Sequence, residues 1–227
     1  MGRMRGEALA QEVLRLKRER NAVILAHSYQ LPEVQEVADF VGDSLGLARE
    51  AQRTRAEVIV FCGVHFMAEV ADILSRPEQV SILPDLAAGC SMADMADIDQ
   101  VHRAWSELQT AVDVDRLVPI TYMNSSAAIK AFVGRHGGAV CTSSNARAVL
   151  EWALARGRQV LFFPDQHLGR YLMEVTGRRM ILWPGACMVH EVFSIQDLIR
   201  IRRQNPGCLV MAHPECPQNI LEISDVI

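Results

Sequence analysis

The residues of this sequence best suited to chemistry recur at a nearly constant spacing, each at the end of a short apolar run. His27, Tyr122 and His213 follow such runs and are 95 and 91 residues apart. Imidazole and phenol side chains can transfer protons and can hydrogen-bond to substrate oxygens. Because a fixed period marks a repeat architecture, we expect related segments to present these side chains at equivalent places.

A serine and a cysteine follow at matching distances in the first two copies of the repeat. Ser44 precedes Cys90 by 46 residues, and Ser143 precedes Cys187 by 44 residues. The third copy begins at His213 and reaches Ser224-Asp225-Val226-Ile227. Extrapolation places its cysteine roughly 45 residues further on. We therefore interpret the chain as a truncated three-repeat protein that lacks its third cysteine.

Short apolar runs alternate with helical patterns along the chain, as is typical of parallel strands covered on both faces. These runs cover residues 22–25, 58–61, 117–120, 160–163, 180–182 and 208–211. The alternation predicts an α/β fold, a pseudo-threefold repeat of three-layer αβα units with short parallel sheets and an incomplete third unit. The predicted units are residues 1–110, 111–195 and 196–227.

The predicted strand ends are where a ligand would bind, because in parallel α/β sheets loops and helix N-termini meet there. Ser44 and Ser143 precede helical patterns, so each can cap a helix or help to bind an anion. Tyr122 and Asn124 are two residues apart at one strand end, so both can face one ligand.

The bulk composition excludes some classes of partner. The 227 residues carry a formal net charge of −4, whereas backbone binding to nucleic acid usually needs a basic face. No apolar stretch approaches the roughly 20 residues of a membrane-spanning helix. The first 21 residues include Glu7 and Glu12, so they are predicted to form a surface helix instead of a signal peptide. We expect a cytoplasmic protein with no nucleic-acid or membrane partner.

The six cysteines include no C-x-x-C pair, which disfavours a zinc ribbon or a thioredoxin-like motif. If three repeats surround one axis, Cys90, Cys187 and the missing third cysteine would converge. Three thiolates can hold a cubane [4Fe-4S] cluster that keeps one iron open as a Lewis acid.

With these residues together, the chain resembles the quinolinate synthase family over essentially its whole length. The resemblance is carried by His27-Ser28-Tyr29-Gln30, Gly42-Asp43-Ser44, Gly89-Cys90-Ser91-Met92-Ala93-Asp94, Tyr122-Met123-Asn124-Ser125-Ser126, Cys141-Thr142-Ser143-Ser144-Asn145, Pro164-Asp165-Gln166-His167-Leu168-Gly169 and His213-Pro214-Glu215-Cys216. It implies condensation of iminoaspartate with dihydroxyacetone phosphate to quinolinate in NAD biosynthesis, with an oxygen-sensitive [4Fe-4S] cluster. It also implies an aspartate oxidase or aspartate dehydrogenase as the source of the imine.

The resemblance further implies roles for individual residues. Cys90 and Cys187 match two cluster ligands, whereas Cys216 matches a position that does not bind iron. Tyr29 and Glu215 are the candidates for proton transfer. The candidates for substrate binding are His27, Ser44, Tyr122, Asn124, Ser143, His190 and His213. His167 lies in a matching motif but is given no role, and Cys62, Cys141 and Cys208 are interpreted as packing residues.

Two further expectations follow. Without the third cysteine, the 227 residues are expected to be inactive and not to hold a stable cluster. The alternative function is an α/β repeat module that binds a small dicarboxylate or phosphate without catalysis, which the serines at helix starts would serve equally well. A Rossmann dehydrogenase is disfavoured because no G-x-G-x-x-G follows a predicted strand.

Overall fold

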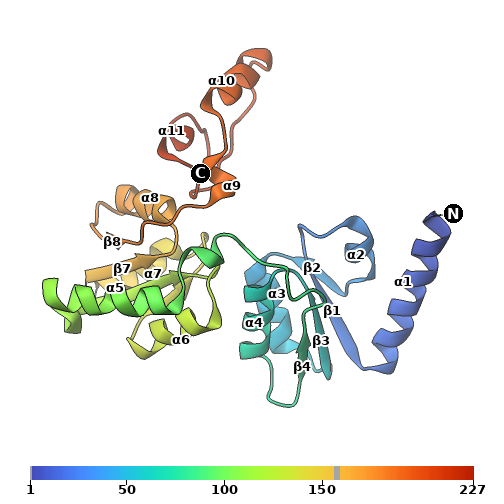
Figure 1. Cartoon of the computed structure of the whole chain (residues 1–227). Coiled ribbons are helices and arrows are strands. Elements are labelled where there is room, and N and C mark those ends of the chain that lie inside the picture. Colours follow the sequence, from blue (N-terminus) through green and yellow to red (C-terminus); the bar gives the residue numbers. More distant parts are fainter. Residues whose placement is uncertain (1, 156–158) are drawn as a thin grey trace. The chain divides into compact units, whose positions relative to one another are not determined.

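The computed structural model of the protein describes residues 2–155 and 159–227, which form two compact units, residues 1–90 and 91–227 (Figure 1). The predicted second repeat, residues 111–195, includes residues 156–158, which lie outside the described residues. The three repeat boundaries expected from the sequence stay a prediction.

The first unit is a four-stranded parallel sheet flanked by helices. Its elements are α1 (Gly2–Glu19), β1 (Ala22–His27), α2 (Pro32–Val37), β2 (Phe40–Gly42), α3 (Ser44–Arg53), β3 (Val58–Cys62), α4 (His65–Leu74) and β4 (Val80–Ile82). The strand order is β2-β1-β3-β4, with all pairings parallel. Leu25 and Ala26 of β1 are fully buried, as expected for a central strand covered on both faces.

The second unit repeats this topology. Its elements up to the end of the sheet are the short 3-10 helices η1 (Ala93–Met95) and η2 (Val114–Arg116), together with α5 (Ile98–Ala111), β5 (Leu117–Tyr122), α6 (Ala127–Arg135), β6 (Ala139–Cys141), α7 (Ala146–Leu154), β7 (Gln159–Phe163), α8 (Gln166–Thr176) and β8 (Ile181–Leu182). The strand order is β6-β5-β7-β8, again entirely parallel. All six residues of β5 are buried. The predicted α/β class, with αβα units and short parallel sheets, is therefore confirmed.

One side of the second sheet packs against α5 and α6. Trp105 of α5 and Phe132 of α6 meet edge-on at 5.3 Å between ring centroids and bury Phe163 of β7 in the same cluster. Asp97 begins α5 with a capping box, in which its side chain accepts from the Gln100 amide and the Gln100 side chain accepts from the Asp97 amide. Local capping and apolar packing thus agree on where this helix lies.

The segment after the sheet is helical and loop-rich. It contains α9 (Met188–Glu191), α10 (Ile195–Gln204) and α11 (Gln218–Leu221). A strand was predicted at residues 208–211, but this part of the described chain forms only an isolated parallel bridge between Met211 and Val226. Met211 is 80% exposed, so no second layer covers the run, and an apolar sequence alone does not make a strand.

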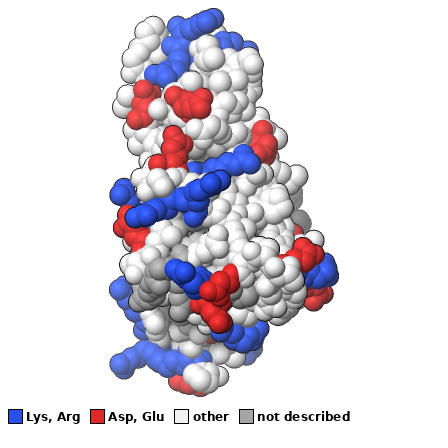
Figure 2. Space-filling model, turned by 90° about the vertical axis from the view of Figure 1, so that its left-hand side faces the viewer, with Lys and Arg blue, Asp and Glu red and all other residues white. Residues whose placement is uncertain are grey.

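Two general expectations can be compared with the described residues. No helix among them is both long and apolar enough to span a bilayer. On the face shown in Figure 2, basic and acidic side chains are interspersed among uncharged ones. A single extended basic face, which nucleic-acid binding would favour, is not what this view shows.

Candidate functional site

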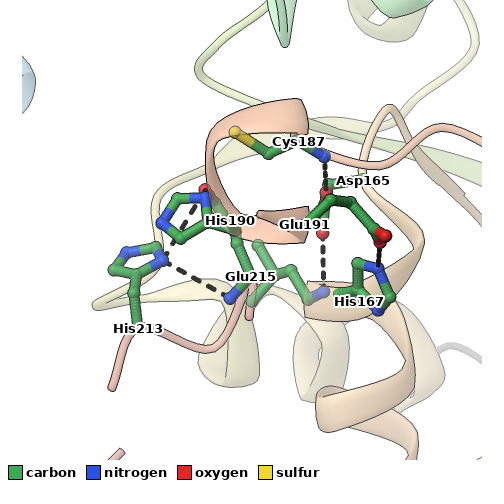
Figure 3. A network of polar contacts seen from close by, with 8 residues as sticks. Asp165, His167, Cys187, His190, Glu191, His213 and Glu215 are labelled. Atoms are coloured by element: carbon green, nitrogen blue, oxygen red, sulfur yellow. Dashed lines mark hydrogen bonds and ion pairs between the residues drawn. The ribbon is translucent and has the colours of Figure 1, made fainter. Parts of the chain in front are cut away.

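The most concentrated group of reactive side chains lies in the second unit, around the short helix α9 (Figure 3). Cys187 is the N-cap residue of α9 and His190 lies in its single turn, while Glu215 comes from the loop before α11. One donor atom from each of these three side chains lies within 4.8 Å of the other two. The sequence analysis named all three, and the structure brings them together.

Backbone contacts place Cys187 in this group. Gly185 forms a parallel bridge with Asp165, and the Gln166 amide donates to the Gly185 carbonyl at 2.7 Å. A Cβ added at Gly185 would lie 2.5 Å from the Pro164 carbonyl oxygen, so only glycine allows this approach. The glycine two residues before the cysteine is therefore a positioning element.

Asp165 holds the same segment in place through hydrogen bonds to backbone amides. This carboxylate is fully buried, caps α8 by accepting from the Leu168 amide at 2.8 Å, and accepts from the Cys187 amide at 3.0 Å. Burial raises the pKa of Asp165, although these backbone hydrogen bonds oppose the change. The sequence analysis assigned Asp165 no role, and only its position in a matching motif could have indicated one.

Glu215 is a buried carboxylate that lies beside two histidines. It is 3% exposed, and burial together with the charge of Asp165 raises its pKa to about 7. Its Oε2 lies 3.4 Å from Nδ1 of His190 and 3.6 Å from Nδ1 of His213, whose rings stack at 5.4 Å. Burial lowers the pKa of both histidines, which favours their neutral form. The contacts between Glu215 and the two imidazoles therefore carry less charge than ion pairs between fully ionised groups.

Some buried polar atoms of the group have no hydrogen-bond partner. Among the described residues, Oε1 of Glu215 and Nδ1 of His190 are buried without one. The 3.4 Å approach of His190 to Oε2 of Glu215 is close enough for an ion pair but does not meet hydrogen-bond geometry. Buried atoms of this kind are uncommon in folded proteins, and a water molecule, an ion or a ligand can satisfy them.

Tyr122 extends the group to the end of β5. Burial, together with the nearby charge of Glu215, raises the pKa of Tyr122 far above the usual value. Asn124, two residues on, is half-buried. Ser143 does not cap α7, whose N-cap residue is Asn145. Tyr122 lies close enough to Ser143 and Glu215 for both to affect its pKa.

His167 and Glu191 add a second acid-imidazole contact. Nε2 of His167, the second residue of α8, contacts Oε1 of Glu191 at the end of α9, as Figure 3 shows. His167 is 9% exposed. This contact ties α8 to α9, and Glu191 was missed because its partner lies 24 residues away in sequence.

A cavity of about 480 Å³ adjoins the group within the second unit. Its polar lining includes His190, His213 and Asp197, and its apolar lining comes from α10, from the segment before it and from residues 210–212. Cys216 also lines the cavity, is 4% exposed and packs with Ile220 and Leu221. A small polar ligand could reach the histidines from this cavity.

The first unit presents its predicted site residues at the corresponding sheet end. His27 closes β1, is 6% exposed and has its pKa lowered by burial, and its Nδ1 accepts from the Tyr29 amide at 3.2 Å. Tyr29 is 89% exposed, with its ring 4.5 Å from that of His27. Ser44 is the first residue of α3, but Asp43 is the capping residue, accepting from the Gly46 amide at 2.6 Å. Cys90 is half-buried in the loop after β4.

The chain is similar to known proteins over most of its length. A model of the quinolinate synthetase A protein family matches residues 11–227. A relative from Thermus thermophilus named quinolinate synthase is 58% identical over 217 residues, covering 95% of this chain and 66% of the relative. Relatives of the same name from Corynebacterium glutamicum and Rhodopirellula baltica are 52% and 45% identical, covering 89% and 98% of this chain. The chain spans 58% and 67% of the length of these last two relatives.

Proposed function

Since the chain belongs to the quinolinate synthetase A protein family, we propose that it acts in NAD biosynthesis as a quinolinate synthase, a transferase. In the proposed reaction iminoaspartate condenses with dihydroxyacetone phosphate, releasing phosphate and water and closing the pyridine ring of quinolinate. The observation that carries the proposal is the family match over residues 11–227, which includes the group formed by buried Cys187 and Glu215 and half-buried His190.

The cofactor of the proposal is a [4Fe-4S] cluster. Iron-sulfur clusters are held by cysteine thiolates, and the described cysteines form no disulfide that would withhold Cys90 or Cys187. Cys90 lies in the segment after β4 and Cys187 in the segment after β8, so neither residue is part of a strand. These two residues fit the role, and a cluster held by three thiolates would supply an iron with an open position as a Lewis acid.

Glu215 is proposed as a proton-transfer group. A general acid or base works best when its pKa lies near the operating pH, and burial has brought the pKa of Glu215 to about 7. Its Oε2 already approaches two imidazoles, so it can exchange a proton with a substrate held between them. Tyr29 is the second candidate, and its 89% exposure leaves its hydroxyl accessible to a ligand.

The remaining predicted residues are proposed to bind substrate. In the second unit, His190 and His213 line the cavity, while Tyr122 lies close to Ser143 and Glu215. Asn124 follows on the same strand end. In the first unit, His27 and Ser44 stand at the end of the sheet and at the start of α3, positions suited to a carboxylate or phosphate.

Partners and location belong to the same proposal. An L-aspartate oxidase or aspartate dehydrogenase would supply the unstable imine, and the cytoplasm is the proposed compartment. We further propose that the 227 residues alone are inactive, because they hold two of the three cysteines that the cluster needs.

The test compares this chain with a chimera that continues into the corresponding segment of the Thermus thermophilus relative. Both proteins are reconstituted anaerobically with iron and sulfide and assayed for quinolinate, iron and sulfide. We expect about four irons per chain and quinolinate formation in the chimera only. Cys90→Ser and Cys187→Ser should abolish both signals, while Cys208→Ser, on a loop cysteine outside the group, should keep them.

Two other outcomes of this test would require a different proposal. A full cluster in the 227-residue chain would mean that another cysteine, such as Cys216, is a ligand. A chimera that binds dihydroxyacetone phosphate or a dicarboxylate, but neither assembles a cluster nor makes quinolinate, would favour the binding-module alternative.

A further inference from the structure

The spacing of Cys187 and His190 places their side chains on one side of a single helical turn. Cys187 is the N-cap residue of α9, and His190 follows three residues later in the same turn (Figure 3). Residues three apart on a helix are neighbours, so the sulfur and the ring project together. Glu215 approaches from a separate loop, and the donor atoms of the three residues lie within 4.8 Å of each other.

The group is also incompletely satisfied. Glu215 is 3% exposed, and its Oε1 has no hydrogen-bond partner among the described residues, nor has Nδ1 of His190. A buried polar atom left without a partner destabilises the folded protein, and a charged group does so more strongly. A cation bound between these two atoms and the Cys187 thiol would give both of them a partner.

The donor types select the cation. One sulfur, one imidazole nitrogen and one carboxylate oxygen suit Zn²⁺ and disfavour Mg²⁺ and Ca²⁺, which take oxygen ligands. Ligands about 2.0–2.3 Å from a tetrahedral zinc are roughly 3.5 Å apart, so the group must contract by about 1 Å.

Contacts at both ends of α9 hold Cys187 and its helix in place. The Cys187 amide donates to Oδ2 of Asp165 at 3.0 Å, and the contact of His167 with Glu191 anchors the other end of α9. Supporting hydrogen bonds of this kind orient metal ligands and are a regular part of metal sites. Burial raises the pKa of the Cys187 thiol, so a nearby cation is what would favour its thiolate form.

We infer that Cys187, His190 and Glu215 form a binding site for a single Zn²⁺ ion, with the fourth position open to water. The inference is independent of the proposed function, because it needs neither Cys90 nor a third cysteine and lies wholly within the second unit. It also goes beyond that function, because a zinc ion on Cys187 and an iron-sulfur cluster on the same sulfur exclude each other. Zinc would then act as an inhibitor of cluster assembly, a consequence that rests on the proposed function.

The test uses the 227-residue chain, reduced and metal-free, titrated anaerobically with Co²⁺ as a spectroscopic substitute for Zn²⁺. We expect one Co²⁺ per chain, with visible bands of tetrahedral cobalt and a near-ultraviolet band from thiolate-to-cobalt charge transfer, all removed by one equivalent of Zn²⁺. Cys187→Ser should abolish the charge-transfer band. His190→Ala and Glu215→Gln should weaken Co²⁺ binding at least about tenfold.

Control variants separate this site from its neighbours. Cys208→Ser and Cys90→Ser should leave the cobalt spectrum unchanged, although Cys90→Ser should abolish cluster assembly in the chimera described above. Circular dichroism of each metal-free variant verifies its fold. Zinc X-ray absorption on the unmodified chain gives a second measurement that needs no variant, and one sulfur in the coordination sphere is expected.

Several results would overturn the inference. These are octahedral cobalt without a thiolate band, a band that survives Cys187→Ser, or a band lost in Cys216→Ser but kept in Cys187→Ser. Zinc coordinated by two or more sulfurs would do so as well. A chimera that fails to make quinolinate while the cobalt results hold would count against the proposed function alone.

Discussion

The two units share one sheet topology but differ in how deeply the carboxylates near their sheets are buried. In residues 1–90, Asp43, which caps α3 after β2, is exposed, and Tyr29 beyond β1 is 89% exposed. In residues 91–227, Asp165, which caps α8 after β7, is 0% exposed, and Glu215, in the loop before α11, is 3% exposed. A parallel sheet therefore determines where reactive side chains gather, whereas the segments that follow it determine how far those side chains are removed from water.

This difference has an electrostatic consequence. Buried ionisable groups that lack a partner depart from the pKa values that they have in water. Glu215, with a pKa of about 7, is an example, and the segment that buries it follows the second sheet. The covering loops make the second unit the better place for acid-base chemistry and for a metal.

The largest effect should come from the two capping aspartates. Asp165→Ala removes a helix cap and leaves the Cys187 amide without its acceptor, so we expect the free energy of unfolding to fall by about 2–4 kcal/mol. Asp43→Ala removes only an exposed cap, for which about 1 kcal/mol is expected. Urea unfolding followed by circular dichroism measures both. Equal losses would mean that burial does not distinguish the two units in this respect.

Two glycines give a smaller contrast. In Gly185→Ala the new Cβ would lie 2.5 Å from the Pro164 carbonyl oxygen, and backbone cannot yield as a side chain can, so a loss of about 1–3 kcal/mol is expected. In Gly42→Ala the new Cβ meets Leu47 at an ordinary 3.8 Å, and the change should stay within about 0.5 kcal/mol. The same urea titrations apply. A harmless Gly185→Ala would show that the approach of residue 185 to Pro164 is not required.

The smallest effect is the pH dependence of the first unit. Burial lowers the pKa of His27 below 6.5, so the unfolded chain takes up a proton before the folded chain does. The stability contributed by neutral His27 is present above that value and is lost as the pH falls below 6.5. His27→Gln should therefore show a shallower fall in urea midpoint between about pH 7.5 and about pH 5.5.

His65→Gln, on the exposed start of α4, is the matched control for this pH series and should follow the unmodified chain. An identical fall in the His27→Gln variant would show that His27 does not contribute to acid sensitivity.

The features predictable from sequence were those encoded locally. Apolar runs ending at His27 and Tyr122 located the central strands and the side chains at their ends, because a strand covered on both faces must be apolar until it leaves the sheet. The same logic failed at residues 208–211, where the run is apolar but no neighbouring strand pairs with it beyond one bridge at Met211. Strand formation depends on a partner, which a single run does not reveal.

The site was predictable in membership but not in arrangement. His190, Glu215 and Cys187 were named through resemblance, yet their mutual distances depend on how α9 and the loop at Glu215 fold back. Asp165 and Glu191 were missed because their importance lies in contacts 22 and 24 residues away, with the Cys187 amide and with His167. A carboxylate that acts by positioning another residue has no local sequence signature.

The asymmetry between the units extends to their tryptophans. Trp105 is packed in the core beside α6, Trp152 lies on α7, and the indole N–H of Trp183 donates to the Met95 carbonyl at 3.1 Å. The sequence has three tryptophans, so all of them belong to the second unit. Tryptophan fluorescence of this protein is therefore a signal from residues 91–227 alone, and melting of the first unit by itself would leave that signal unchanged.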